Sequence, residues 1–141
     1  MARDVFVDTW GWCVLIDRRD PDHGRAASLV RSLIRSGVRL VSSDYVLDES
    51  CTLAKARAGS AAAIRLLSLV EGTAALDLEW VGSERFERAK RRFRKYRDQA
   101  FSFTDCTSFE IMREREIEEA VTSDDHFRIA GFRLLPDAST P

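Results

Sequence analysis

The chain has 141 residues, of which 45% are hydrophobic and 32% are charged. This composition fits one compact globular domain and excludes an intrinsically disordered chain. The formal net charge of −1 provides no overall field that would attract a nucleic acid, so such binding would need a local basic patch. We expect no membrane association, because no apolar run is long enough to span a bilayer and no signal-peptide pattern is present.

Three cysteines and two histidines are too few and too scattered for several common kinds of site. A disulfide scaffold, a structural zinc site and Ser-His-Asp chemistry are therefore poor fits. We interpret the cysteines as small buried apolar residues, and we expect a cytoplasmic location, where thiols stay reduced.

Predicted strands and helices alternate along the chain. The first stretch, residues 4–10, contains a short buried strand that ends on the carboxylate of Asp8. The other predicted strands lie at 38–41, 75–81, 119–122 and 132–135. The predicted helices lie at 10–16, 22–36, 44–57, 60–70, 83–97, 104–115 and 126–130. This alternation predicts one α/β domain over residues 1–136, with a central parallel sheet of about five short strands, helices on both faces and a tail at 137–141.

Two acidic residues follow predicted strands. Asp8 ends the first strand, and Asp124 lies in the turn after the fourth. Open parallel sheets place their sites at the carboxyl ends of strands, near the point where the strand order reverses. Two carboxylates side by side at such ends would repel each other without a metal ion. Each residue also has a simpler interpretation, Asp8 as a helix cap and Asp124 as a turn former.

Two further acids lie on predicted helices. Asp105 occupies the first turn of a helix that we expect Thr104 to cap, close to the apolar face of that helix. Glu49 lies in the middle of another, rather apolar helix. Taken singly, Asp105 is explained by the helix dipole and Glu49 by exposure to solvent. The order and local contexts of all four acids together favour a shared site.

The acids lie in four short segments: Val5-Phe6-Val7-Asp8-Thr9, Ser43-Asp44-Tyr45-Val46-Leu47-Asp48-Glu49, Ser102-Phe103-Thr104-Asp105-Cys106 and Val121-Thr122-Ser123-Asp124-Asp125-His126-Phe127. Together these segments resemble the signature blocks of PIN-domain ribonucleases, especially the small VapC-like toxins of type II toxin–antitoxin pairs. The resemblance covers nearly the whole chain and is weakest in its middle. It implies a PIN-like nuclease domain whose catalytic and metal-binding acids are Asp8, Glu49, Asp105 and Asp124.

The resemblance further implies an endoribonuclease that hydrolyses RNA phosphodiester bonds with Mg²⁺ or Mn²⁺. Hard oxygen ligands select these ions over zinc. We expect Asp8, Asp105 and Asp124 to lie closest to the metal and Glu49 to orient water or a second ion, the number of ions staying open. The hydroxyl groups expected to hydrogen-bond the carboxylates are those of Thr9, Ser43, Thr104 and Thr122.

The partners that the resemblance implies are an RNA substrate, a small antitoxin protein and a second copy of the chain in a homodimer. The participation of Asp44, Asp48 and Asp125, which neighbour the matched acids, stays open. We interpret His126 as a structural residue and not as a general base. The sequence does not indicate which RNA is cut.

The predicted helix at 83–97 is strongly basic. It carries eight of the 22 lysines and arginines of the chain, Arg85, Arg88, Lys90, Arg91, Arg92, Arg94, Lys95 and Arg97. Apolar residues at helical spacing give it an opposite, core-facing side. The basic side is either a solvated surface or a track for RNA phosphates that leads to the acidic site. In the second case, neutralising Arg91, Arg92 and Arg94 together weakens RNA binding.

Two other functions stay open at this stage. One is a catalytically inactive, RNA-binding or regulatory PIN module. The other is a phosphotransfer domain with Asp8 as its nucleophile, although Trp10 stands where a haloacid-dehalogenase-like phosphatase would need a second aspartate.

Overall fold

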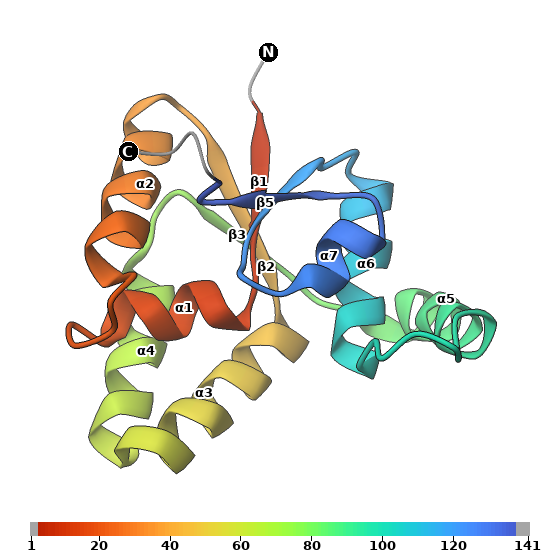
Figure 1. The fold of residues 1–141 in the computed structure, drawn as a ribbon, viewed down its shortest axis with the longest axis horizontal. Coiled ribbons are helices and arrows are strands. Elements are labelled where there is room, and N and C mark those ends of the chain that lie inside the picture. The colour runs from red at the N-terminus through yellow and green to blue at the C-terminus, as the bar shows by residue number, and fades with distance from the viewer. Residues whose placement is uncertain (1–2, 138–141) are drawn as a thin grey trace.

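The computed structural model describes residues 3–137 and contains a five-stranded sheet with β1 at its centre (Figure 1). The strands are β1 (Asp4–Val7), β2 (Arg39–Ser43), β3 (Leu76–Glu79), β4 (Glu119–Val121) and β5 (Arg133–Leu135), in the order β3-β2-β1-β4-β5. All four pairings are parallel, which confirms the predicted sheet. The domain boundary at residue 136 stays a prediction, and the predicted tail lies outside the described residues except for Asp137.

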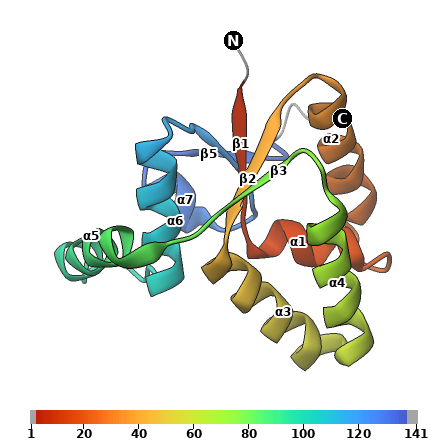
Figure 2. The same ribbon diagram turned by 180° about the vertical axis from the view of Figure 1, so that it is seen from behind.

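Helices lie on both sides of the sheet. Within residues 3–137 they are α1 (Thr9–Ile16), α2 (His23–Arg35), α3 (Asp44–Ala58), α4 (Ser60–Gly72), α5 (Gly82–Lys95), α6 (Phe103–Glu114) and α7 (Asp125–Ile129). The first four pack together on one side, and the last three lie on the other side (Figures 1 and 2). The predicted elements are all present, with ends that agree to within two residues. None of the described helices has the length and apolar composition needed to cross a bilayer.

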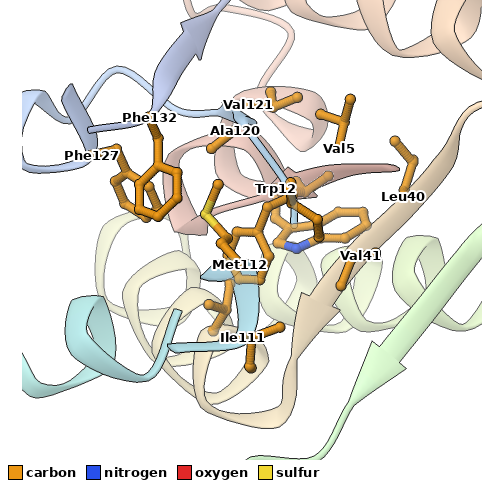
Figure 3. Packing of buried hydrophobic residues seen from close by; sticks show 14 of the residues in the cluster. Val5, Trp12, Leu40, Val41, Ile111, Met112, Ala120, Val121, Phe127 and Phe132 are labelled. Carbon is orange, nitrogen blue, oxygen red and sulfur yellow. The ribbon is translucent and has the colours of Figure 1, made fainter. Parts of the chain in front are cut away.

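The core lies between the sheet and its two helical layers. Residues 5–7 of β1 are fully buried, as expected for a central parallel strand that is covered on both faces. Figure 3 shows Trp12 of α1 and Met112 of α6 among the side chains of the strands. The indole N–H of Trp12 donates to the hydroxyl of Ser42 (3.1 Å), which in turn donates to the carbonyl of Val7 (2.8 Å). The buried polar groups at this junction are thus satisfied, and α1, β2 and β1 are tied together.

Gly11 allows α1 to lie directly against the sheet. A Cβ atom at this position would be 2.9 Å from the carbonyl oxygen of Val121 and 2.9 Å from a methyl carbon of Val7. Real Cβ atoms essentially never approach other atoms so closely, so a side chain would push the helix away. Gly11 therefore fixes the first turn of α1, and with it Asp8, against the ends of β1 and β4.

An ion-pair network holds the carboxyl end of α6. Arg115, which follows α6, donates to Asp4 of β1 (3.0 Å) and to two acidic residues of β3, Asp77 (3.2 Å) and Glu79 (2.6 Å). These side chains are 22% to 38% exposed, so the network is only partly shielded from solvent. It anchors the end of α6 that lies far from the amino terminus of that helix.

Candidate active site

The topology creates a switch point between β1 and β4. The chain runs from β1 toward β2 and β3 on one side, whereas β4 and β5 are added on the other side. Val7 and Val121 pair directly, so the residues that follow these two strands meet at the same edge of the sheet. Asp8 follows β1, and Thr122 to Asp124 follow β4. The sheet therefore brings the first and fourth predicted acids together, as strand-end sites require.

Asp8 is a buried carboxylate, only 5% exposed, at the bottom of this edge. Thr122 donates a hydrogen bond to it (3.0 Å), as predicted. Burial raises the pKa of Asp8 to about 7, against the hydrogen bonds from the backbone of Thr9 and the side chain of Thr122, and the nearby charges of Asp105 and Glu49 add to the rise. Asp8 occupies the N-cap position of α1, but its side chain makes no capping hydrogen bond there, so capping alone does not account for this buried carboxylate.

Asp105 is fixed by the amino terminus of α6. Its backbone N–H donates to the hydroxyl of Ser102 (2.9 Å), and its carboxylate accepts from the backbone N–H of Ser102 (3.0 Å). This reciprocal capping box makes Ser102 the cap of α6 and corrects the prediction that Thr104 caps it. Asp105 is 7% exposed, and burial raises its pKa even though Ser102 and His126 hydrogen-bond it.

Asp124 and His126 complete a cluster with Asp105. The ring Nδ1 of His126 lies 3.0 Å from the carboxylate of Asp105 and 3.2 Å from that of Asp124. Asp124 is oriented by its own backbone, which donates to Thr122 (3.1 Å), and its carboxylate accepts from the backbone N–H of His126 (2.9 Å). One ligand atom from each of Asp105, Asp124 and His126 lies within 4.8 Å of the others.

The sequence did not predict the contacts of His126 with Asp105 and Asp124, and the interpretation of His126 as a structural residue stays a prediction. Only the contact between α6 and α7 brings His126 to Asp105, which is 21 residues away in the chain. Its place two residues after Asp124 is the one local signal, because that spacing lets its backbone N–H close an Asx turn.

Glu49 reaches the site from α3. Its carboxylate accepts a hydrogen bond from the hydroxyl of Thr9 (2.8 Å), the residue after Asp8. The side chain is exposed, yet it lines the same groove of about 280 Å³ as Asp8 and Asp124. Asp105 joins this group through His126. Three of the four predicted acids thus line one groove at the switch point, and Asp105 lies beside it.

Several neighbouring residues are occupied elsewhere. Asp44 accepts a hydrogen bond from the backbone of Val81 (2.9 Å), and Asp125 pairs with Arg128 on the surface. Asp48 is exposed on α3. Of the four hydroxyl groups expected to bind carboxylates, those of Thr9 and Thr122 do so. The other two do not within the described part of the chain: Ser43 caps α3 through Val46, and Thr104 has no such bond.

The cleft has the donor set of a divalent cation site. Within residues 3–137 no lysine or arginine forms an ion pair with any of the four acids, although Arg57 lines the groove and His126 contacts Asp105 and Asp124. Asp8 and Asp105 are buried carboxylates whose ionised forms are unfavourable as they stand. A bound divalent ion would relieve both the burial and the mutual repulsion. Carboxylate oxygens suit Mg²⁺ or Mn²⁺, so the residues present fit such an ion.

Comparisons with known proteins agree with this geometry. The sequence model of the PIN domain matches residues 5–133. The 23S rRNA-specific endonuclease VapC20 of Mycobacterium tuberculosis is 35% identical to the chain over 133 residues, which cover 91% of this chain and 95% of that protein. Membership of the PIN family argues against the interpretation of Asp8 as the nucleophile of a phosphotransfer domain.

Solved structures show the same fold. The crystal structure of M. tuberculosis VapC20, described as a toxin that cleaves the sarcin-ricin loop, superposes with a TM-score of 0.79 at 32% identity, covering 91% of this chain and 95% of that one. DNA-bound VapBC of Salmonella typhimurium shares the fold alone, with a TM-score of 0.63 at 16% identity over 95% of this chain and 97% of that one. The chain therefore belongs to the PIN-domain family of ribonucleases, among its VapC-like members.

Proposed function

We propose that Asp8, Asp105 and Asp124 hold Mg²⁺ or Mn²⁺ in this endoribonuclease and that Glu49 orients water beside them. The observation that supports the proposal is that Asp8, Glu49 and Asp124 line one groove beside Asp105, and that no lysine or arginine within residues 3–137 forms an ion pair with any of the four. When bound, the divalent ion supplies a water of lowered pKa and neutralises charge on the phosphate oxygens.

The residues of the chain hold this arrangement in place before substrate arrives. Thr122 orients the Asp8 carboxylate, and the capping box with Ser102 orients that of Asp105. His126 bridges Asp105 and Asp124 and sets their separation. Such preorganisation is what electrostatic catalysis of phosphoryl transfer requires, because the charges need not reorganise during the reaction.

Glu49 has a different task from the three acids nearer the sheet. Thr9 donates to one of its carboxylate oxygens, Oε1. The second oxygen is then available to accept a hydrogen bond from a water molecule in the groove. Its exposure fits a residue that positions water better than one that binds metal directly.

The test compares RNA cleavage by the wild type, Asp8→Asn and Asp105→Asn in Mg²⁺ buffer, with Asp125→Asn as the matched control. We expect each site variant to lose at least about a hundredfold in rate. The control should keep its activity because Asp125 is exposed and paired with Arg128. Undiminished cleavage by Asp8→Asn would overturn the assignment.

We propose a loop of 23S ribosomal RNA as the substrate, because the VapC20 relative carries that specificity in its name and covers 91% of this chain. Incubation of the protein with intact ribosomes, followed by mapping of 23S rRNA ends, tests this choice. A cut confined to another RNA would contradict it.

The proposed partners are a small antitoxin protein and a second copy of the chain, and the proposed location is the cytoplasm, where ribosomes are found. Support for the antitoxin comes from two structures with the same fold, VapBC2 from Rickettsia felis and VapBC from Salmonella typhimurium. Co-expression with the product of an adjacent short reading frame, followed by size-exclusion chromatography, tests both partners.

A further inference from the structure

The structure divides the basic residues of α5 into two groups. Arg85, Arg88 and Arg92 recur at helical spacing on the side that faces α6. Arg92 pairs with Glu110 of α6 (2.5 Å), and Arg88 pairs with both Glu110 (3.3 Å) and Glu114 (2.9 Å). The positive charge of this row is therefore already balanced within the fold.

The second group is distinguished by its lack of ion pairs in the described part of the chain, although Arg91 and Lys95 line one groove with Arg88, Arg92 and Glu110. Arg91 and Arg94 are exposed, and neither they nor Arg97 form an ion pair within residues 3–137. Lys95 likewise forms no ion pair within the described residues, and its nitrogen lies 5.3 Å from the ring centre of Tyr96. The sequence predicted one uniformly basic face, whereas the fold leaves free charge mainly on this second row.

The carboxyl end of α5 is connected to the acidic site through a chain of aromatic rings. Tyr96, directly after α5, lies 6.2 Å from the ring of Phe101, which in turn lies 5.6 Å from the ring of His126. His126 contacts Asp105 in the cleft. Two ring-to-ring contacts thus connect the carboxyl end of α5 with Asp105.

Exposed aromatic rings lie at the same end of α5. Phe93 is 45% exposed although it packs against Phe103, and Tyr96 is 36% exposed. Rings interleaved with arginine and lysine are the surface on which unpaired nucleobases stack while the cations contact phosphates. A purely structural role as last-turn cations of a helix would explain Arg94 and Lys95, but not the exposed rings beside them.

We infer that Arg91, Arg94 and Lys95, with Tyr96, form the surface that holds the unpaired strand of the RNA next to the cleavage site. The inference rests on the proposed function, since it concerns the substrate of that same site. It assigns binding to the second row alone and leaves Arg88 and Arg92 as structural residues.

The experiment measures binding of a fluorescent RNA hairpin across a KCl series in EDTA, so that no RNA is cut. The variant is Arg91→Gln with Arg94→Gln and Lys95→Gln. Each lost phosphate contact on a single strand flattens the slope of log K against log salt by about 0.7, so we expect the slope to fall by about 2. The affinity of the triple variant for RNA should fall tenfold or more. A separate variant, Arg91→Lys with Arg94→Lys and an intact Lys95, should bind RNA like the wild type because it keeps the positive charge.

Two controls isolate the row. Arg31→Gln with Arg35→Gln and Arg65→Gln removes the same charge from the exposed surfaces of α2 and α4, across the molecule from α5 (Figures 1 and 2). Arg92→Gln with Glu110→Gln removes a pair from the balanced row without changing net charge. Both should bind RNA like the wild type. Equal weakening in the first control would reduce the effect to net charge and overturn the inference.

Cleavage kinetics separate this inference from the proposed function. The triple variant should raise KM and leave kcat close to the wild-type value, because its residues lie outside the acidic cleft. A wild type that cuts RNA beside a triple variant with unchanged KM and salt slope would refute the inference alone. Absence of RNA cleavage by the wild type would instead refute the proposed function.

Discussion

At the scale of single residues, the buried carboxylate of Asp8 is proposed to bind metal, yet its ionisation lowers the stability of the metal-free protein. Its pKa of about 7 in the fold exceeds the ordinary value of 3.8, so the folded state holds the proton more tightly than the unfolded state. The stability that Asp8 contributes is therefore complete below pH 4 and is lost as the pH rises toward 7. The shift amounts to a few kcal/mol by the rule of about 1.4 kcal/mol per unit, as an upper bound.

It follows that Asp8→Asn stabilises the metal-free protein at pH 8 and changes little at pH 4. The amide keeps an acceptor for Thr122 and removes the buried charge. Urea unfolding in EDTA at both pH values measures the difference. A less stable variant at pH 8 would show that the carboxylate is not under strain there.

Metal binding should reverse this order of stability, so that the wild type becomes more stable than Asp8→Asn. An ion that binds only the folded state raises its stability by about 2.7 kcal/mol at a hundred times Kd. We expect Mn²⁺ to raise the Tm of the wild type and of Asp125→Asn, and to leave that of Asp8→Asn nearly unchanged. Thermal unfolding with and without the ion provides the comparison.

The residues show where sequence reasoning reaches its limit. Asp8 and Asp124 were predictable because strand ends and turns are local features. His126 was not, because its role arises only when α6 and α7 pack together. The sequence predicts Thr104 as the cap of α6, whereas Ser102 caps it. Two hydroxyl residues lie near the start of this helix, and only the backbone geometry distinguishes them.

At the scale of elements, the contact of α1 with the sheet depends on Gly11. Gly11→Ala should destabilise the fold by roughly 1–3 kcal/mol, because a methyl group would overlap the carbonyl of Val121. It should also weaken metal binding, since α1 begins directly after Asp8. Gly24→Ala on α2, which meets nothing within 4 Å, is the matched control and should be neutral or slightly stabilising. Unfolding midpoints of the two variants decide between overlap and backbone entropy.

α5 shows the same limit for a whole element. Its amphipathic, basic character was readable from spacing alone. The division of its charges was not, because the balancing acids Glu110 and Glu114 belong to α6. Any helix whose partners come from another helix poses this difficulty.

At the scale of the whole molecule, element types and limits followed from capping residues, glycines and hydrophobic spacing. Gly37 and Gly59, with φ of 82° and 89°, end α2 and α3 as expected of glycine. Alternation of strands and helices predicted a parallel sheet but not the order β3-β2-β1-β4-β5. That order decides which strand ends adjoin, so the site followed from the family resemblance and not from composition.

The two ends of α6 differ in charge. Near its first turn Asp105 lies among other acids, and just past its last turn Arg115 is paired with Asp4. The 12 residues of the helix separate these ends by about 18 Å. Dissolved KCl screens the charges at both ends, so it weakens the repulsion around Asp105 and also weakens the ion pair between Arg115 and Asp4. In the metal-free protein these responses oppose each other. A saturating divalent ion cancels the first, so added KCl should lower the melting temperature of the Mn²⁺-loaded protein more steeply than that of the metal-free one.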